Sequence, residues 1–138
     1  MHTITENETE IISLDYLKGI GYEYALGPDI SPDGLFVERH YNEVVLVNRL
    51  RSAIDKLNPS ISDEGKADAL KKILRTDSPN FLINNETFHN YLTEGIDIEF
   101  RKDGGIRGDK VYLVDFMNPD NNEFLAVNQF TVIEEGNN

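Results

Sequence analysis

Three sets of residues in the chain have side chains that can hold a metal ion. An Asp on one strand and an acid-x-Lys pair on the next can bind one ion, because the carboxylates converge and the Lys polarises the attacking water. Glu64-Gly65-Lys66 supplies the acid-x-Lys half, and Pro-Asp pairs at 28–29, 32–33 and 119–120 supply the first half. However, Glu64 and Lys66 lie at the start of a predicted helix, where residues two apart point in different directions. The Pro-Asp pairs lie in predicted loops, so we interpret this combination as chance.

The other two sets of residues are weaker candidates for a metal site. The run from Asp115 to Glu123 is rich in oxygen ligands, but it lacks the glycine and the spaced acids of an EF-hand, so it predicts a plain turn. His40 and His89 lie far apart and have no ligand spacing. The chain has no phosphate-binding loop, dinucleotide fingerprint or nucleophile elbow. Composition and spacing alone therefore predict no complete active site.

Composition excludes several classes of protein. The chain has 138 residues, 39% of them hydrophobic, which predicts a single folded domain over 1–138. With no cysteine, disulfides and thiolate chemistry are excluded. No apolar run approaches the ~18 residues of a membrane span, and the polar, acidic start does not resemble a signal peptide, so we expect a cytoplasmic protein without membrane contact. The formal net charge of -12 predicts that the chain alone grips nucleic acid poorly.

A first helix is predicted from about Glu6 to Lys18. Thr5 and Glu8 fit a capping box, in which each side chain satisfies a free backbone N–H of the other residue. Glu10, Leu14 and Leu17 share one stripe of this helix, so an acid lies in line with core leucines. By itself the stripe favours a carboxylate stabilised by the helix dipole.

A loop at 27–34, rich in Pro and Gly, separates this helix from three more. The second ends at Leu57, and its start is left open because valines near 44–47 also suit a strand. The third spans about 62–74 and the fourth about 80–94, with Gly95 as the C-terminal stop. The residues expected to face inward are Leu46, Leu50, Ala53 and Leu57, then Ala67, Leu70 and Leu74, then Phe81, Phe88 and Leu92.

The last third of the chain predicts strands. Apolar and charged residues alternate over 96–101, Asp103-Gly104-Gly105 signals a hairpin, and a second strand is predicted over 111–116. After a turn at 118–122, a third strand is predicted over 124–133. It starts with four apolar residues, as expected of a strand covered on both faces. This order of elements predicts an α+β fold.

The ordered set of short motifs resembles the N-terminal region of the R subunit of type I restriction enzymes. No single motif is specific, but together they cover about 130 residues. They are Gly21-Tyr22-Glu23-Tyr24, Gly27-Pro28-Asp29-Ile30, Asp33-Gly34, Glu38-Arg39, Glu43-Val44-Val45-Leu46, Arg49-Leu50, Leu57-Asn58-Pro59, Asn84-Asn85, Phe88-His89, Gly95-Ile96, Val114-Asp115-Phe116, Asn118-Pro119, Asn121-Asn122-Glu123-Phe124 and Val127-Asn128-Gln129-Phe130-Thr131-Val132.

The resemblance implies a partial PD-(D/E)xK nuclease core, formed by the first helix and the 124–133 strand, with a mainly helical insertion and a hairpin at about 27–116. It places the catalytic Asp and acid-x-Lys strands after the equivalent of Asn138, so we expect this chain alone to be inactive and to need no cofactor. It also implies that the parent subunit cleaves unmodified double-stranded DNA with Mg²⁺, translocates it with ATP, and works with specificity and methylation subunits.

Folds of this type often place an extra acid from the first helix near the metal. Glu10 matches that position, and Glu6, one turn earlier, is the alternative. Two other interpretations stay open. The chain could be a non-catalytic module that docks other subunits, since an acidic surface suits a partner with basic patches. A second copy of the chain could also pair with an exposed strand edge.

Overall fold

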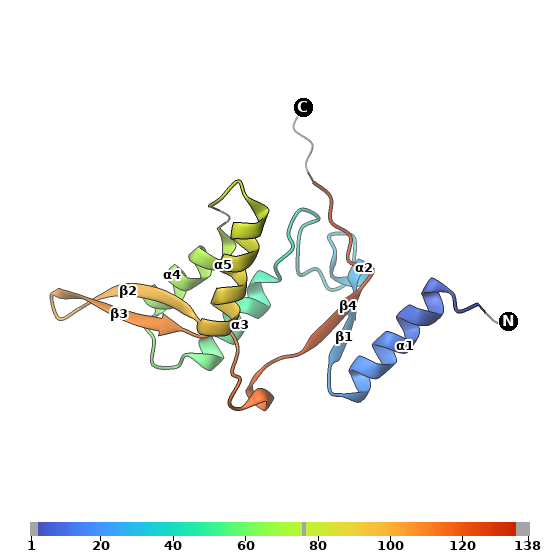
Figure 1. Ribbon diagram of the computed structural model, residues 1–138, viewed down its shortest axis with the longest axis horizontal. Helices are drawn as coiled ribbons and strands as arrows, with labels where there is room; N and C mark the ends of the chain where they lie inside the picture. The colour runs from blue at the N-terminus through green and yellow to red at the C-terminus, as the bar shows by residue number, and fades with distance from the viewer. Residues whose placement is uncertain (1–2, 76, 135–138) are drawn as a thin grey trace. The chain divides into compact units, whose positions relative to one another are not determined.

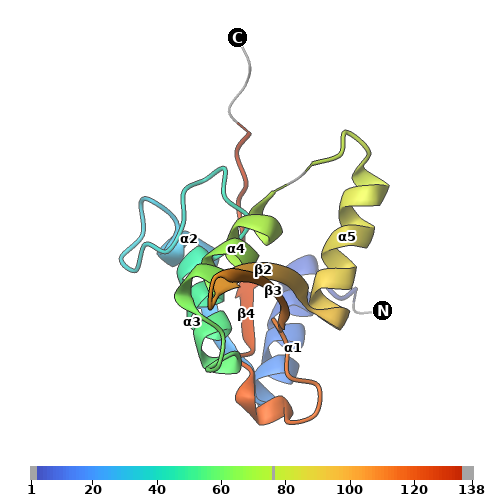
Figure 2. The same cartoon turned by 90° about the vertical axis from the view of Figure 1, so that its left-hand side faces the viewer.

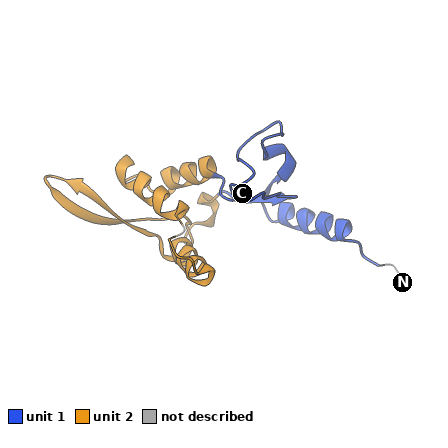
Figure 3. Cartoon of the chain, turned by 90° about the horizontal axis from the view of Figure 1, so that it is seen from above, with its two compact units in different colours: residues 1–46, 123–138 blue, residues 47–122 orange. Residues whose placement is uncertain are grey.

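The computed structural model describes residues 3–75 and 77–134. Its helices and strands confirm the α+β class. They fall into two compact units, one formed by residues 1–46 and 123–138 and the other by residues 47–122 (Figure 3). We call residues 47–122 the inner unit, because in the sequence they interrupt residues 1–46 and 123–138, which we call the outer unit.

The outer unit is built on a pair of parallel strands (Figure 1). Strand β1 (Glu23–Leu26) pairs with β4 (Leu125–Asn128) from Glu23 opposite Leu125 to Leu26 opposite Asn128. Helix α1 (Glu6–Gly19) packs against both strands. The predicted capping box is confirmed, because Thr5 and Glu8 bond to each other's backbone N–H at 3.2 and 2.8 Å.

The structure of this unit differs from the sequence analysis in three places. Strand β1 was not predicted, because it is only four residues long and its partner lies about a hundred residues away. The 27–34 segment begins with a one-turn helix, α2 (Gly27–Ile30), since a proline in the first turn needs no hydrogen-bonded N–H. The strand predicted over 124–133 ends at Asn128, because Gln129 has a positive φ of 53°.

The described residues of the inner unit form three α-helices and a hairpin (Figures 1 and 2). The helices are α3 (Val47–Leu57), α4 (Asp63–Leu74) and α5 (Phe81–Glu94), and their predicted ends are confirmed within two residues. Strand β2 (Ile96–Lys102) pairs antiparallel with β3 (Gly105–Val111) and packs on α4. The core consists of Ile54, Ile61, Ala69, Ile73, Ile96, Ile98, Val111 and Leu113.

The second strand of the hairpin was predicted too late in the sequence. Lys102 pairs with Gly105, so the turn consists of Asp103 and Gly104 alone, with φ of 51° and 77°. Two left-handed residues match the twist of the flanking strands, as in a type I′ turn. The chain therefore re-enters the ladder at Gly105, and 112–116 continues without strand structure.

The predicted inward faces of α4 and α5 were largely wrong. In α4 the buried residues are Gly65, Ala69 and Ile73, whereas Ala67 and Leu74 are exposed. Helix α5 has no buried residue, and Phe81 is 82% exposed. Helical spacing finds an apolar stripe, but it cannot tell which of two stripes meets the sheet. No helix in 3–75 and 77–134 has the length and apolar character to span a membrane.

Candidate functional site at the end of strand β4

The carboxylate of Glu10 lies at the carboxyl end of β4. Asn128 Nδ2 donates to Glu10 Oε1 at 2.8 Å, and Gln129 Nε2 donates to both oxygens at 2.9 and 3.1 Å. Glu10, Leu14 and Leu17 are the half-buried stripe of α1, as their spacing indicated. The side chain is thus turned toward the sheet and engages β4 rather than its own helix end.

Tyr24 extends this polar cluster to the neighbouring strand. Its hydroxyl donates to Asn128 Oδ1 at 2.7 Å, and Lys18 Nζ lies 4.5 Å from the centre of its ring. Asn128 therefore uses both ends of its amide, one toward Glu10 and one toward Tyr24. The sequence analysis did not predict these partners. A signal was present, because polar residues that directly follow an apolar strand often mark a functional site at the carboxyl edge of a sheet.

Close backbone approach fixes the turn after β4. A Cβ on Gly27 would overlap the carbonyl oxygens of Asn128 and Gln129, so only glycine fits at the start of α2. Gln129 leaves the strand with a left-handed backbone, which swings its amide toward α1. The two amides that hold Glu10 are thus placed by the backbone itself.

The buried side chain of Arg39 positions residues 130–131, which follow Gln129. Its guanidinium donates to the carbonyls of Glu43, Tyr41 and Thr131 at 2.8, 3.0 and 2.7 Å, and it lies 3.9 Å over the ring of Phe130. Charge-assisted bonds of this kind are stronger than neutral ones. Arg39 therefore holds the 130–131 segment against the 41–43 turn.

One carboxylate does not make a metal site. Mg²⁺ favours six oxygen ligands, usually one or two carboxylates with water and substrate oxygens. Within the described ranges, no three His, Asp or Glu side chains gather in a way that could hold an ion. Glu10 and the amide oxygens beside it offer only part of such a ligand set.

The acid-x-Lys pair lies at the start of a helix, as the sequence predicted. Glu64 and Lys66 lie in the first turns of α4, and none of the Pro-Asp pairs lies on a strand. Lys66 Nζ forms an ion pair with Asp55 at 3.3 Å. His40 and His89 are exposed.

The predicted turn at 118–122 is confirmed and includes a short 3₁₀ helix, η1 (Pro119–Asn121). The Asp115 carboxylate accepts bonds from Met117 N, Asn118 N and Asn121 Nδ2 at 2.9–3.0 Å. The hydrogen bond from the Asn121 side chain is the main cause that lowers the pKa of Asp115, followed by that from Asn118. The oxygens of this run therefore serve the turn itself.

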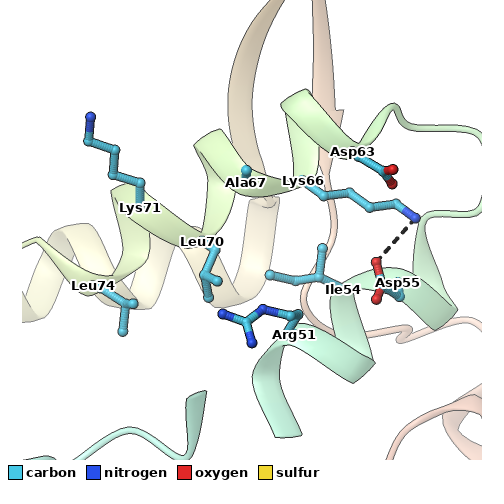
Figure 4. A pocket seen from close by; sticks show the side chains of 9 residues that line it. All are labelled: Arg51, Ile54, Asp55, Asp63, Lys66, Ala67, Leu70, Lys71 and Leu74. Atoms are coloured by element: carbon cyan, nitrogen blue, oxygen red, sulfur yellow. Dashed lines mark ion pairs between the residues drawn. The ribbon is translucent and has the colours of Figure 1, made fainter. Parts of the chain in front are cut away.

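A groove of about 420 Å³ runs between α3 and α4 (Figure 4). Ile54, Leu70 and Leu74 give it an apolar lining, and charged side chains surround it, namely Arg51, Asp55, Asp63, Lys66 and Lys71. Because it lacks a nucleophile with an adjacent base, it suits contact with an apolar surface better than catalysis.

The structure holds one positioned acid on an α+β fold, and comparison with known proteins gives the family. Residues 3–138 match the family model described as type I restriction enzyme R protein N terminus. The chain therefore belongs to this family, and the resemblance seen in its motifs is confirmed. No solved structure matches it.

Two curated relatives carry the same region. The HindI endonuclease subunit of a type I restriction enzyme from Haemophilus influenzae is 33% identical over 130 residues, which is 94% of this chain. The putative MjaIXP endonuclease subunit from Methanocaldococcus jannaschii is 34% identical over 124 residues, or 89% of this chain. The chain spans 12% of the length of each relative.

Proposed function

We propose that the chain is the N-terminal part of a nuclease domain in a type I restriction R subunit. The complete subunit would cleave unmodified double-stranded DNA with Mg²⁺ and translocate it with ATP, in a complex with specificity and methylation subunits. Family membership over residues 3–138 and the endonuclease names of both relatives support this function.

Within that domain, α1 and β4 would form part of a PD-(D/E)xK core. Two observations favour this assignment. Helix α1 packs on the β1–β4 pair, and the carboxylate of Glu10 meets the carboxyl end of β4. The 27–116 segment would be the insertion, and most of it lies in the inner unit at 47–122.

Glu10 would be the accessory acid beside the metal. Asn128 and Gln129 hold its carboxylate in one orientation, so it can meet an ion with little loss of side-chain freedom. Bound Mg²⁺ would supply charge stabilisation and an activated water. Glu6 is exposed and lies one turn nearer the helix start, which favours Glu10 of the two.

Glu10→Gln in the complete subunit tests this role. The change keeps size and helix propensity but removes the charge. We expect DNA cleavage to slow by about tenfold or more, the scale seen when groups around a bound metal are lost. ATP hydrolysis and translocation, measured on the same preparation, should stay at wild-type rates because they use another domain.

Glu6→Gln is the matched control, since it removes an equal charge from the same helix without touching β4. It should cleave as the wild type does. Wild-type cleavage by the Glu10 variant would return Glu10 to a structural acid. The second candidate function is a docking module for other subunits, and the apolar groove between α3 and α4 is the supporting observation.

A further inference from the structure

The β2–β3 hairpin is anchored at its base and free at its turn. Ile98 is buried against α4, and Lys72 Nζ donates from α4 to the carbonyl of Asp97 at 2.6 Å. Lys110 Nζ forms an ion pair with the same residue's carboxylate at 3.3 Å. The turn end of the ribbon extends past α4 (Figure 1), and residues 101–107 are exposed apart from half-buried Gly105.

The free end of the hairpin is basic in an acidic chain. Arg101, Lys102 and Arg107 lie within 101–107, where Asp103 is the only acid, although the whole chain has 13 basic and 25 acidic residues. Across the described ranges, none of these three cations forms an ion pair. Acids return only behind the tip, at Glu99 and Asp109. The tip is therefore a local positive charge that acids of the same chain do not neutralise.

The register distributes these cations over both faces of the ribbon. Phe100 pairs with Arg107 and Lys102 with Gly105, so Lys102 and Arg107 share one face. Arg101 pairs with Ile106 on the other face, where Ile106 is 67% exposed. Gly104 has open space around its Cβ position, so another backbone can approach the turn closely.

The width of a two-stranded ribbon fits the major groove of duplex DNA. Two strands lie about 4.8 Å apart, and the major groove of B-DNA, about 12 Å wide and 8.5 Å deep, admits a two-stranded ribbon. A ribbon in that groove has a phosphate wall on each side, which the cations on the two faces can meet. The tight Asp103-Gly104 turn keeps the tip narrow and holds the strands in register.

We propose that the hairpin tip, residues 101–107, is a contact site for the phosphate backbone of duplex DNA. The inference rests on the proposed function, since only a subunit that handles DNA would present this ribbon to it. It goes beyond that function by assigning a DNA contact to the inner unit, which does not contain Glu10. The remaining acidic surface repels the duplex, so the contact is confined to the tip.

Binding of a short DNA duplex to this chain, followed by fluorescence anisotropy, tests the site. The triple variant Arg101→Gln, Lys102→Gln, Arg107→Gln should bind at least about tenfold more weakly at low salt. The slope of log affinity against log salt should become less steep by about 2 to 3, because each phosphate contact contributes about 0.9. Thermal unfolding should not change, since all three side chains are exposed.

The matched control is Arg51→Gln, Lys56→Gln, Lys71→Gln, which removes three exposed cations from α3 and α4 of the same unit. It should keep the wild-type slope. In the unchanged chain, duplex DNA should protect Lys102 from acetylation more strongly than Lys71.

Three results overturn the proposal. They are equal losses in both triple variants, no measurable binding by the unchanged chain at low salt, and tighter hairpin-dependent binding of poly-glutamate than of DNA. The last would assign the tip to an acidic protein. None of these measurements uses cleavage, so a failed hairpin site and a failed nuclease assignment are distinguished by the Glu10 variant.

Discussion

At the scale of single residues, the hydrogen-bond donors around a carboxylate show which part of the structure it stabilises. Glu10 accepts from two amides that lie more than a hundred residues away, whereas Asp115 accepts from residues two to six positions further along. The stripe that turns Glu10 toward the sheet could be predicted, because helical spacing is local. Polar residues after the apolar run indicated a site at the end of β4. The bonds of these two amides to Glu10 could not be predicted, because they depend on the left-handed backbone of Gln129 and the close contact at Gly27.

The pKa of Asp115 makes a prediction at this scale. Hydrogen bonds hold the pKa below its usual value of 3.8, so the folded state binds the proton less well than the unfolded state. The carboxylate therefore stabilises the fold above about pH 3.8, and this contribution is lost as pH falls through the lower, folded-state pKa. Asp115→Asn should reduce stability at pH 7 and have a diminishing effect in acid.

Urea unfolding of both proteins across this pH range measures the difference. Asp120→Asn, which removes an equal charge from η1 without these bonds, serves as the control and should leave stability at pH 7 unchanged. A stability difference for Asp115→Asn that stays constant down to acid pH would contradict the assignment.

At the scale of elements, helices were easier to predict than strands. The ends of α1, α4 and α5 follow from local caps at Thr5, Ser62 and Asn80. The parallel β1–β4 pair depends on a partner that no local pattern reveals. The hairpin register does have a local signal, since Asp-Gly favours a two-residue turn, and placing the second strand after 110 overlooked it.

Asn58 joins two elements of the inner unit. From the end of α3, its Nδ2 donates to the Tyr112 carbonyl at 2.8 Å and its Oδ1 accepts from Tyr112 N at 2.8 Å. Asn58 is buried, so Asn58→Ala would leave both backbone groups without a partner. Each unmet group costs about 1–3 kcal/mol, so the loss of two should lower the free energy of unfolding by about 2–6 kcal/mol.

Chemical denaturation measures this loss, with Asn48→Ala on the exposed face of α3 as the control. The control should change stability by less than about 0.5 kcal/mol. A loss of that small size in the Asn58 variant would mean that water replaces the amide.

At the scale of the whole molecule, the net charge and the fold have opposite effects on DNA binding. A net charge of -12 opposes binding to a phosphate backbone, so DNA affinity in this chain has to come from local cations. Composition could predict this opposition. It could not predict the basic tip, because only the register places Arg101, Lys102 and Arg107 together beyond the core.

The last prediction concerns catalysis by the chain on its own. Hydrolysis of a DNA phosphodiester by this type of nuclease needs a metal held by several oxygens and a group that activates water. The described residues bring one carboxylate to the end of β4, and Lys66 is committed to Asp55. Supercoiled plasmid incubated with the purified chain and Mg²⁺ should therefore stay supercoiled, and the Glu10→Gln chain should behave identically. Nicking that elutes with the folded chain, stops with EDTA and disappears in the Glu10 variant would show that these residues suffice for cleavage.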